Sequence, residues 1–279
     1  MEPVLKWAGG KRQLIRQLVS YINLDSLNGH RYYEPFIGGG ALAFSLEYSD
    51  VVINDSNKEL INVYEVIKKY PNELILELKK HEAKHSKDYY YKIRELDRNI
   101  EEYKKMSNIE KAARIVYLNK TCYNGLYRVN SKGFNNVPIG RTTSRNPDIV
   151  MESRIITLSN YLNNNNVIIR CGDFKKAVQD ANAGDIIYFD PPYDYEKEGF
   201  KAYVKTGFTH DDLKRLSKTC DDLISRGCIV IISNNDTKFV RQCFSSSSYK
   251  INEVVTKRYI NCNGEKRTLA KEVIIYGKK

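Results

Sequence analysis

Short runs of consecutive apolar residues recur along the chain and predict buried strands. They occupy residues 51–53, 167–169, 186–189, 229–232 and 273–276. Continuous runs, unlike alternating ones, are typical of strands buried on both faces of a mostly parallel sheet. Several of them end in acids or small polar residues, which is where open α/β sheets bind ligands. The pattern therefore predicts an α/β fold with a site at the carboxyl ends of its strands.

The residues before the run at 229–232 predict an amphipathic helix. Thr209 and Asp212 have capping-box spacing, and Gly227 is a typical helix stop. A helix that leads directly into a strand is the alternation expected of an α/β fold. The positions expected to be buried are Leu213, Leu216, Cys220, Leu223 and Ile224.

Residues 57–166 have a different character, because no buried-strand run appears there. Leu60, Tyr64 and Ile67 have helical spacing, and residues 107–120 begin with a second capping-box pattern. We expect a helical insertion at 57–166, with a hairpin or loop near 122–141, inside a catalytic domain formed by 1–56 and 167–279.

Basic residues outnumber acidic residues along the chain. The 279 residues carry a formal net charge of +11. Such an excess favours a polyanion partner such as nucleic acid, although a basic protein without one remains the alternative.

No apolar run approaches the roughly 18 residues of a membrane span, and residues 1–11 lack a signal-peptide core. We therefore expect a cytoplasmic protein whose six cysteines, which lack zinc-like spacing, stay reduced.

The string Asp190-Pro191-Pro192-Tyr193 follows the run at 186–189 and carries the most specific chemistry. An exocyclic amine of a base is a poor nucleophile, because its lone pair is delocalised into the ring. A carboxylate (Asp190) and a main-chain carbonyl (Pro191) can accept both amine hydrogens and so direct the lone pair, while the prolines stiffen the turn. Tyr193 offers a ring face for an extruded base. The alternative is an ordinary strand followed by a Pro-Pro turn.

A glycine-rich turn, EPFIGGG at residues 34–40, follows a short predicted strand at 31–33. Glycines at such a turn let a ligand approach the backbone closely, but alone this signal is weak. It is not a dinucleotide fingerprint. Asp55, after the run at 51–53, lies where an acid would bind ribose hydroxyls.

A set of short strings occurs in order along the chain: KWAGGK at 6–11, EPFIGGG at 34–40, NDSN at 54–57, YNGLYRVN at 123–130, FNNVPIGR at 134–141, GDF at 172–174, DPPY at 190–193 and ISNNDT at 232–237. Taken together, these strings resemble the Dam-type (α-group, D12 class) DNA adenine-N6 methyltransferases, whose motifs occur in the same order. The resemblance implies a Rossmann-like methyltransferase sheet, mostly parallel with one antiparallel strand, an inserted helical target-recognition domain, and S-adenosylmethionine as cofactor.

The resemblance also implies roles for individual residues. Asp55 would bind the ribose, Asp173 and Phe174 the adenine ring, and Asp190 would serve both the cofactor and the target amine. The implied cofactor residues are Trp7, Gly10, Lys11, Phe36, Gly38, Gly40, Asp55, Asp173, Phe174 and Asp190, and no metal is implied.

For double-stranded DNA the resemblance implies a hairpin that enters the duplex and reads guanine with Arg128. An arginine can bind guanine O6 and N7 with two parallel hydrogen bonds. The alternative is a surface turn with an exposed arginine. The implied DNA contacts are Lys6, Tyr123, Asn124, Leu126, Arg128, Asn130, Pro138 and Arg141.

The segment 194–207 is shorter and more charged than the Ser/Thr-rich loop of the family, so contacts around the flipped base are left open.

The string HEAKH at 81–85 matches a zinc-protease motif. Four lysines crowd it, and we interpret it as a solvated, charged helix face instead.

The sequence predicts site-specific methylation of adenine N6 at a flipped base, with a GATC-like site expected from the resemblance. Rival hypotheses are N4-cytosine methylation, an RNA substrate, and a non-catalytic DNA-binding protein of the same fold. We further expect a monomer in solution, and a restriction endonuclease of the same specificity is one functional partner that this hypothesis allows.

Overall fold

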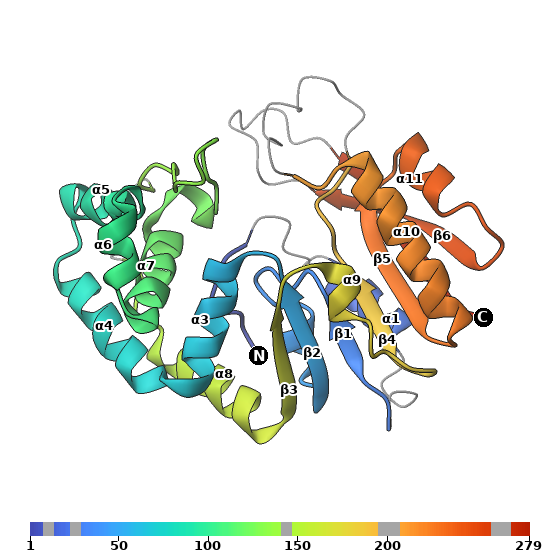
Figure 1. The fold of residues 1–279 in the computed structure, drawn as a ribbon, viewed down its shortest axis with the longest axis horizontal. Coiled ribbons are helices and arrows are strands. Elements are labelled where there is room, and N and C mark those ends of the chain that lie inside the picture. Colours follow the sequence, from blue (N-terminus) through green and yellow to red (C-terminus); the bar gives the residue numbers. More distant parts are fainter. Residues whose placement is uncertain (8–13, 23–28, 141–146, 195–206, 258–268) are drawn as a thin grey trace. The chain divides into compact units, whose positions relative to one another are not determined.

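A computed structural model describes residues 1–7, 14–22, 29–140, 147–194, 207–257 and 269–279. Seven strands form one sheet in the order β3-β2-β1-β4-β5-β7-β6 (Figure 1). Parallel pairing joins β1 to β2 and β4, and β4 to β5, whereas β7 is antiparallel to both β5 and β6. The strands are β1 Tyr32–Glu34, β2 Asp50–Asp55, β3 Asn166–Cys171, β4 Ile186–Phe189, β5 Ile229–Asn235, β6 Tyr249–Lys257 and β7 Leu269–Gly277.

The predicted α/β sheet, mostly parallel with one antiparallel strand, is confirmed. Each of the five apolar runs lies inside a strand, and β4 is buried along its whole length. Strand β6 was not predicted from the sequence. This strand is at one edge of the sheet, polar residues interrupt its apolar ones, and Val255 is exposed. It therefore lacks the continuous apolar run that reveals a buried strand.

The helix predicted before β5 is also confirmed. Helix α10 spans His210–Ser225, and Thr209 and Asp212 form its capping box. Gly227 has a φ of +86°, the left-handed conformation typical of a helix stop. Helix α10 packs against β5 (Figure 1), and its five expected core positions are all buried.

Residues 58–164 are mainly helical. Helix α7 is the central element and contacts α3, α4 and α5, with nine of its residues buried. The expected core positions Leu60, Tyr64 and Ile67 are buried on α3, and Ser107 caps α7 as expected. The helices here are α3 Lys58–Lys69, α4 Pro71–Ala83, α5 Lys87–Glu95, α6 Ile100–Lys105, α7 Asn108–Thr121 and α8 Glu152–Asn164.

The chain divides into two compact units. Unit 1 contains Met1–Lys11, Ile37–Ser49 and Asp55–Gly172, and unit 2 contains Arg12–Phe36, Asp50–Asn54 and Asp173–Lys279. Compactness does not test the functional division at residues 57 and 166, which stays a prediction. Among the described residues, no helix combines the length and the apolar character needed to span a bilayer. Short helices elsewhere are α1 Ile15–Tyr21, α2 Ala43–Leu46, α9 Phe174–Ala177 and α11 Lys238–Cys243.

The interpretation of residues 81–85 as a solvated helix face holds for Glu82, Ala83 and Lys84, which are exposed, but was wrong for the two histidines. His81 is buried, its ring stacks on Tyr117 with 5.0 Å between ring centroids, and its Nδ1 lies 2.8 Å from the Tyr89 hydroxyl. Helix α4 ends at Ala83, so His85 lies beyond the helix, where its Nδ1 is 2.9 Å from the Tyr117 hydroxyl. Burial lowers the pKa of both histidines. They act as packing and hydrogen-bonding residues of the helical core.

Candidate active site and nucleic-acid interface

The carboxyl end of β4 carries Asp190 next to a serine of β5. The parallel register aligns Phe189 with Ile232, so Asp190 comes level with Ser233. The Ser233 hydroxyl donates to Asp190 Oδ1 at 2.9 Å and lies 2.8 Å from the buried Tyr188 hydroxyl. A hydrogen bond from a fixed strand residue orients the carboxylate. Ser233 was not predicted as a site residue, although it lies in the ISNNDT string.

Tyr193 is tied to the antiparallel strand β7. Its hydroxyl donates to Glu272 Oε2 at 3.1 Å. Burial, followed by the negative charges of Asp190 and Glu272, raises the pKa of Tyr193 well above its ordinary value. The phenol therefore stays neutral and keeps its donor role at any pH near neutrality. Of the two prolines between Asp190 and Tyr193, Pro191 is buried and Pro192 is exposed.

In unit 1, Asp55 is held by the backbone of the glycine-rich turn. Its Oδ2 accepts from the Gly38 N–H at 3.1 Å, and its Oδ1 accepts from the Asn57 N–H at 2.9 Å. Burial raises the pKa of Asp55, and these N–H groups oppose that rise. The carboxylate is thus fixed in orientation beside the turn.

The turn itself is shaped by two close approaches. Gly38 has a φ of +47°, and a Cβ there would lie 2.9 Å from Cδ1 of Trp7. Gly40 has a φ of +70°, and a Cβ there would lie 2.1 Å from Phe44. Glycine is needed at both positions, because both the backbone conformation and the neighbouring ring exclude a side chain. Trp7 also stacks on Tyr127, with 5.0 Å between ring centroids.

Unit 2 contains an aromatic cluster beside Asp173. Phe36 lies 5.4 Å from Phe174 and 5.7 Å from Phe208, between ring centroids. Asp173 caps α9 and also accepts from Arg215 Nη1 at 2.7 Å. The Arg215 guanidinium lies 4.5 Å from the centre of the Phe174 ring. Two of the predicted cofactor residues thus share a neighbour, Arg215, that sequence analysis missed.

The predicted hairpin doubles back at two isolated antiparallel bridges, Cys122↔Ile139 and Val129↔Asn135, within the described residues 122–140. Its first turn, η3 Tyr123–Gly125, is joined to the amino-terminal segment by the buried Asn119. The Asn119 side chain exchanges two hydrogen bonds with the backbone of Lys6 and donates to the Gly125 carbonyl at 3.1 Å. Lys6 is thereby placed beside the hairpin.

Arg128 lies in the outgoing arm of the hairpin and is partly exposed. Its Nε donates to Asn136 Oδ1 at 2.7 Å, and its Nη2 donates to the Asn136 carbonyl at 3.2 Å. These bonds orient the guanidinium from the returning arm. Among the other predicted DNA contacts, Tyr123 and Leu126 are partly exposed, while Asn124, Asn130 and Pro138 are exposed. Arg141, Gly10 and Lys11 lie outside the described residues.

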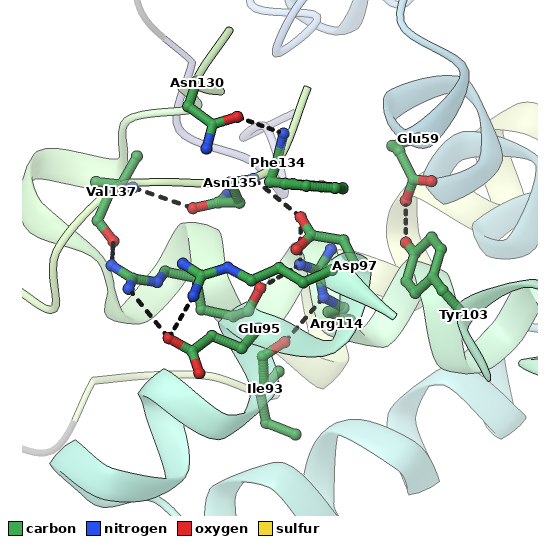
Figure 2. A network of polar contacts seen from close by, with 12 residues as sticks. Glu59, Ile93, Glu95, Asp97, Tyr103, Arg114, Asn130, Phe134, Asn135 and Val137 are labelled. Atoms are coloured by element: carbon green, nitrogen blue, oxygen red, sulfur yellow. Dashed lines mark hydrogen bonds and ion pairs between the residues drawn. The ribbon is translucent and has the colours of Figure 1, made fainter. Parts of the chain in front are cut away.

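A buried ion pair fastens the returning arm to the helices (Figure 2). Arg114 on α7 is 2% exposed, and its Nη2 lies 2.8 Å from Asp97 Oδ2. The same oxygen accepts from the Asn135 N–H at 2.9 Å. The Arg114 guanidinium also donates to the carbonyl of Ile93 at 2.9 Å and to that of Arg94 at 2.7 Å. One buried charge thus joins the end of α5, the turn η2 Leu96–Arg98 and the hairpin.

Comparison with known proteins gives a consistent result. The sequence model of the family described as "D12 class N6 adenine-specific DNA methyltransferase" matches residues 7–260. The chain is 41% identical to the type II methyltransferase M1.LlaDCHI of Lactococcus lactis subsp. cremoris, over 99% of this chain and 95% of that protein. It is 38% identical to the type II methyltransferase M.MjaIII of Methanocaldococcus jannaschii, over 96% and 95%. It is 28% identical to the DNA adenine methylase of Escherichia coli (strain K12), over 97% and 93%.

Proposed function

The chain belongs to the D12 class of N6 adenine-specific DNA methyltransferases, and we propose that it transfers a methyl group from S-adenosylmethionine to N6 of a flipped adenine in a GATC-like duplex site. The observation that carries the catalytic part is the carboxylate of Asp190, oriented by Ser233 at the carboxyl end of β4. The position matches the place where open α/β sheets bind ligands.

In the proposed reaction the protein acts on the target amine. A carboxylate has about four lone-pair sites, so the Ser233 bond orients Asp190 and still lets it accept from the amine. The Pro191 carbonyl accepts the second amine hydrogen, and Tyr193 stacks on the base. The bound cofactor supplies an electrophilic sulfonium methyl group. With both amine hydrogens held, the nitrogen lone pair is directed at that carbon. The new nitrogen–carbon bond would replace the carbon–sulfur bond, a neutral thioether would leave, and the amine would lose one of its two held hydrogens as a proton, so no covalent enzyme intermediate is needed.

The residues present fit S-adenosylmethionine. Asp55 is a fixed carboxylate beside the glycine-rich turn, and an oriented carboxylate can accept from the hydroxyl groups of a ribose. Phe36, which is partly exposed and packs on the buried Phe174, provides aromatic surface for an adenine ring, and Asp173 is an acceptor for its amine. We propose that these residues, with Trp7, Gly38 and Gly40, bind the cofactor, together with Gly10 and Lys11.

Cofactor affinity should fall with decreasing pH, starting at a higher pH than an ordinary aspartate, with its pKa of about 3.9, would produce. Because burial raises the pKa of Asp55, its carboxylate gains a proton earlier and then loses an acceptor for the ribose hydroxyls. Affinity is therefore full above the raised pKa and lost as the pH falls through it. Calorimetric titration with S-adenosylmethionine over the pH range in which the protein stays folded checks this. Asp55→Asn should bind weakly at every pH, and a pH-independent wild-type affinity would argue against this role.

For target recognition we propose that residues 57–166 form the DNA-binding domain. Asn124 and Tyr123 at the hairpin turn would fill the gap left by the flipped base, and Arg128 would read a guanine. The remaining proposed contacts are Lys6, Leu126, Asn130, Pro138 and Arg141. The net charge of +11 supports a polyanionic substrate.

Arg128→Ala should relax the choice of base at one guanine of the site. A bidentate contact contributes about 1–3 kcal/mol, or roughly 5- to 150-fold in discrimination. Sequencing that maps methylated adenines in plasmid DNA measures the change and also defines the recognition sequence, expected to resemble GATC. Lys132→Ala, which removes an exposed cation from the same hairpin, is the matched control and should leave the choice unchanged. Unaltered discrimination in Arg128→Ala would show that another residue reads the guanine.

The biological setting follows from this activity. We propose that the enzyme is a monomer acting in the cytoplasm, and that it protects DNA against a restriction endonuclease of the same specificity. Its similarity to two type II methyltransferases favours this role. Co-expression with an endonuclease that cuts the mapped sequence tests it, because protected cells should survive.

A further inference from the structure

Asp194, the residue directly after the Asp190–Tyr193 tetrad, is held from four sides. Its N–H donates to Asn234 Oδ1 at 2.9 Å, and its carbonyl accepts from the Asn235 side chain. Its carboxylate accepts from Thr237 Oγ1 at 2.6 Å and lies 3.0 Å from His210 Nε2. The side chain is only 10% exposed. Both backbone groups and both carboxylate oxygens of Asp194 are therefore engaged.

The partners are themselves fixed. Asn234 is fully buried, and its Oδ1 also accepts from the Asn235 N–H at 2.8 Å. Pairing with β7 aligns Asn235 with Glu272, the acceptor of the Tyr193 hydroxyl. Thr237 is buried and caps α11. The end of β5 is thus a rigid support, and rigid strands hold site residues more precisely than loops do.

The segment Asp190–Asp194 is consequently hydrogen-bonded at both ends to β5 and to the residues that directly follow it. Ser233 holds Asp190 at one end, and residues 234, 235 and 237 hold Asp194 at the other. Between these ends, two prolines fix φ at two successive positions. We propose that Asp194 is a positioning residue, whose bonds to the end of β5 set the path of Pro191–Tyr193 and hence the aim of the groups that grip the target amine. This inference rests on the proposed role of Asp190.

The test compares Asp194→Ala with a matched control, Asp236→Ala. Asp236 is two residues further along the chain from Asn234, is 14% exposed, and pairs with Arg241 at 2.6 Å. Both variants remove one carboxylate of similar burial: Asp194 contacts the end of β5, and Asp236 directly follows it. Because a displacement of about 1 Å can cost around 10²-fold in rate, Asp194→Ala should lower kcat by about 10- to 100-fold, with KM for DNA and cofactor nearly unchanged. Asp194→Asn, which keeps an acceptor oxygen, should recover most of the loss, and Asp236→Ala should retain wild-type kcat.

A second readout separates positioning from general destabilisation. DNA with 2-aminopurine at the target position reports base extrusion by fluorescence, and Asp194→Ala should still give the full signal with it. Methyl transfer, measured on matched DNA with adenine at that position, should be slow. Wild-type kcat in Asp194→Ala would overturn the inference, and so would a loss of extrusion and affinity in step with kcat. If Asp194→Ala does not fold, the exposed partner His210 is replaced instead, and His210→Ala must lower kcat without changing KM. Active Asp190→Ala would refute the proposed function itself, whereas inactive Asp190→Ala with active Asp194→Ala refutes only this inference.

Discussion

Asp190→Ala is expected to abolish methyl transfer while leaving the affinity for duplex DNA intact. The substitution removes an oriented acceptor that grips the target amine, and loss of one such preorganised group costs about 10²–10³-fold in kcat. DNA affinity should persist, because the phosphate and groove contacts that we propose come from residues 57–166 and not from Asp190.

The measurement pairs single-turnover transfer of labelled methyl with a DNA-binding titration. Asp211→Ala is the control, because Asp211 is 92% exposed on the first turn of α10 and its removal should change neither quantity. Near-normal turnover in Asp190→Ala would reject the proposed role of the carboxylate. Loss of DNA affinity together with turnover would indicate a structural defect.

The second large effect concerns stability. Arg114→Met should lower the free energy of unfolding of unit 1 by about 3–5 kcal/mol, because it leaves the carboxylate of Asp97 without its buried counter-charge. It also leaves the carbonyls of Ile93 and Arg94 without their donor. An unpaired buried polar group costs about 1–3 kcal/mol.

Urea unfolding followed by tryptophan fluorescence measures this locally, because Trp7 is the single tryptophan of the chain and lies in unit 1. The control is Arg98→Met, which removes an exposed ion pair with Glu95 and should cost at most about 1 kcal/mol. Replacing both partners, Asp97→Leu with Arg114→Met, should restore much of the loss, since a buried pair and an apolar pair often have similar stability. Equal midpoints for Arg114→Met and Arg98→Met would contradict the importance of the buried pair.

Where local signals agreed, the fold could be predicted from the sequence. Strand β4 is a continuous apolar run, and α10 combines a capping box, an apolar stripe and a glycine stop. Strand β6 was not predicted because polar residues interrupt its apolar ones, whereas β3, at the other edge of the sheet, contains a continuous apolar run. His81 was assigned to solvent because its neighbours in sequence are lysines, yet its neighbours in space are Tyr89 and Tyr117.

The candidate site was predictable where one short string contains the chemistry, as at Asp190 and its prolines. Residues that act through tertiary contacts were not. Arg114 is a charged residue, a class that is usually exposed, and only the packing of α7 against α5 reveals it as buried. Ser233 is 43 residues from Asp190 and Arg215 is 42 residues from Asp173, so register and helix packing had to be known first.

In the proposed mechanism, Asp190 and the Pro191 carbonyl prepare an adenine amine for attack on a methyl group. The most direct measurement incubates the purified protein with methyl-labelled S-adenosylmethionine and unmethylated duplex DNA, then digests the DNA to nucleosides and separates them. The proposed mechanism predicts that the label appears in N6-methyldeoxyadenosine. Label in N4-methyldeoxycytidine, or in no nucleoside at all, would contradict it.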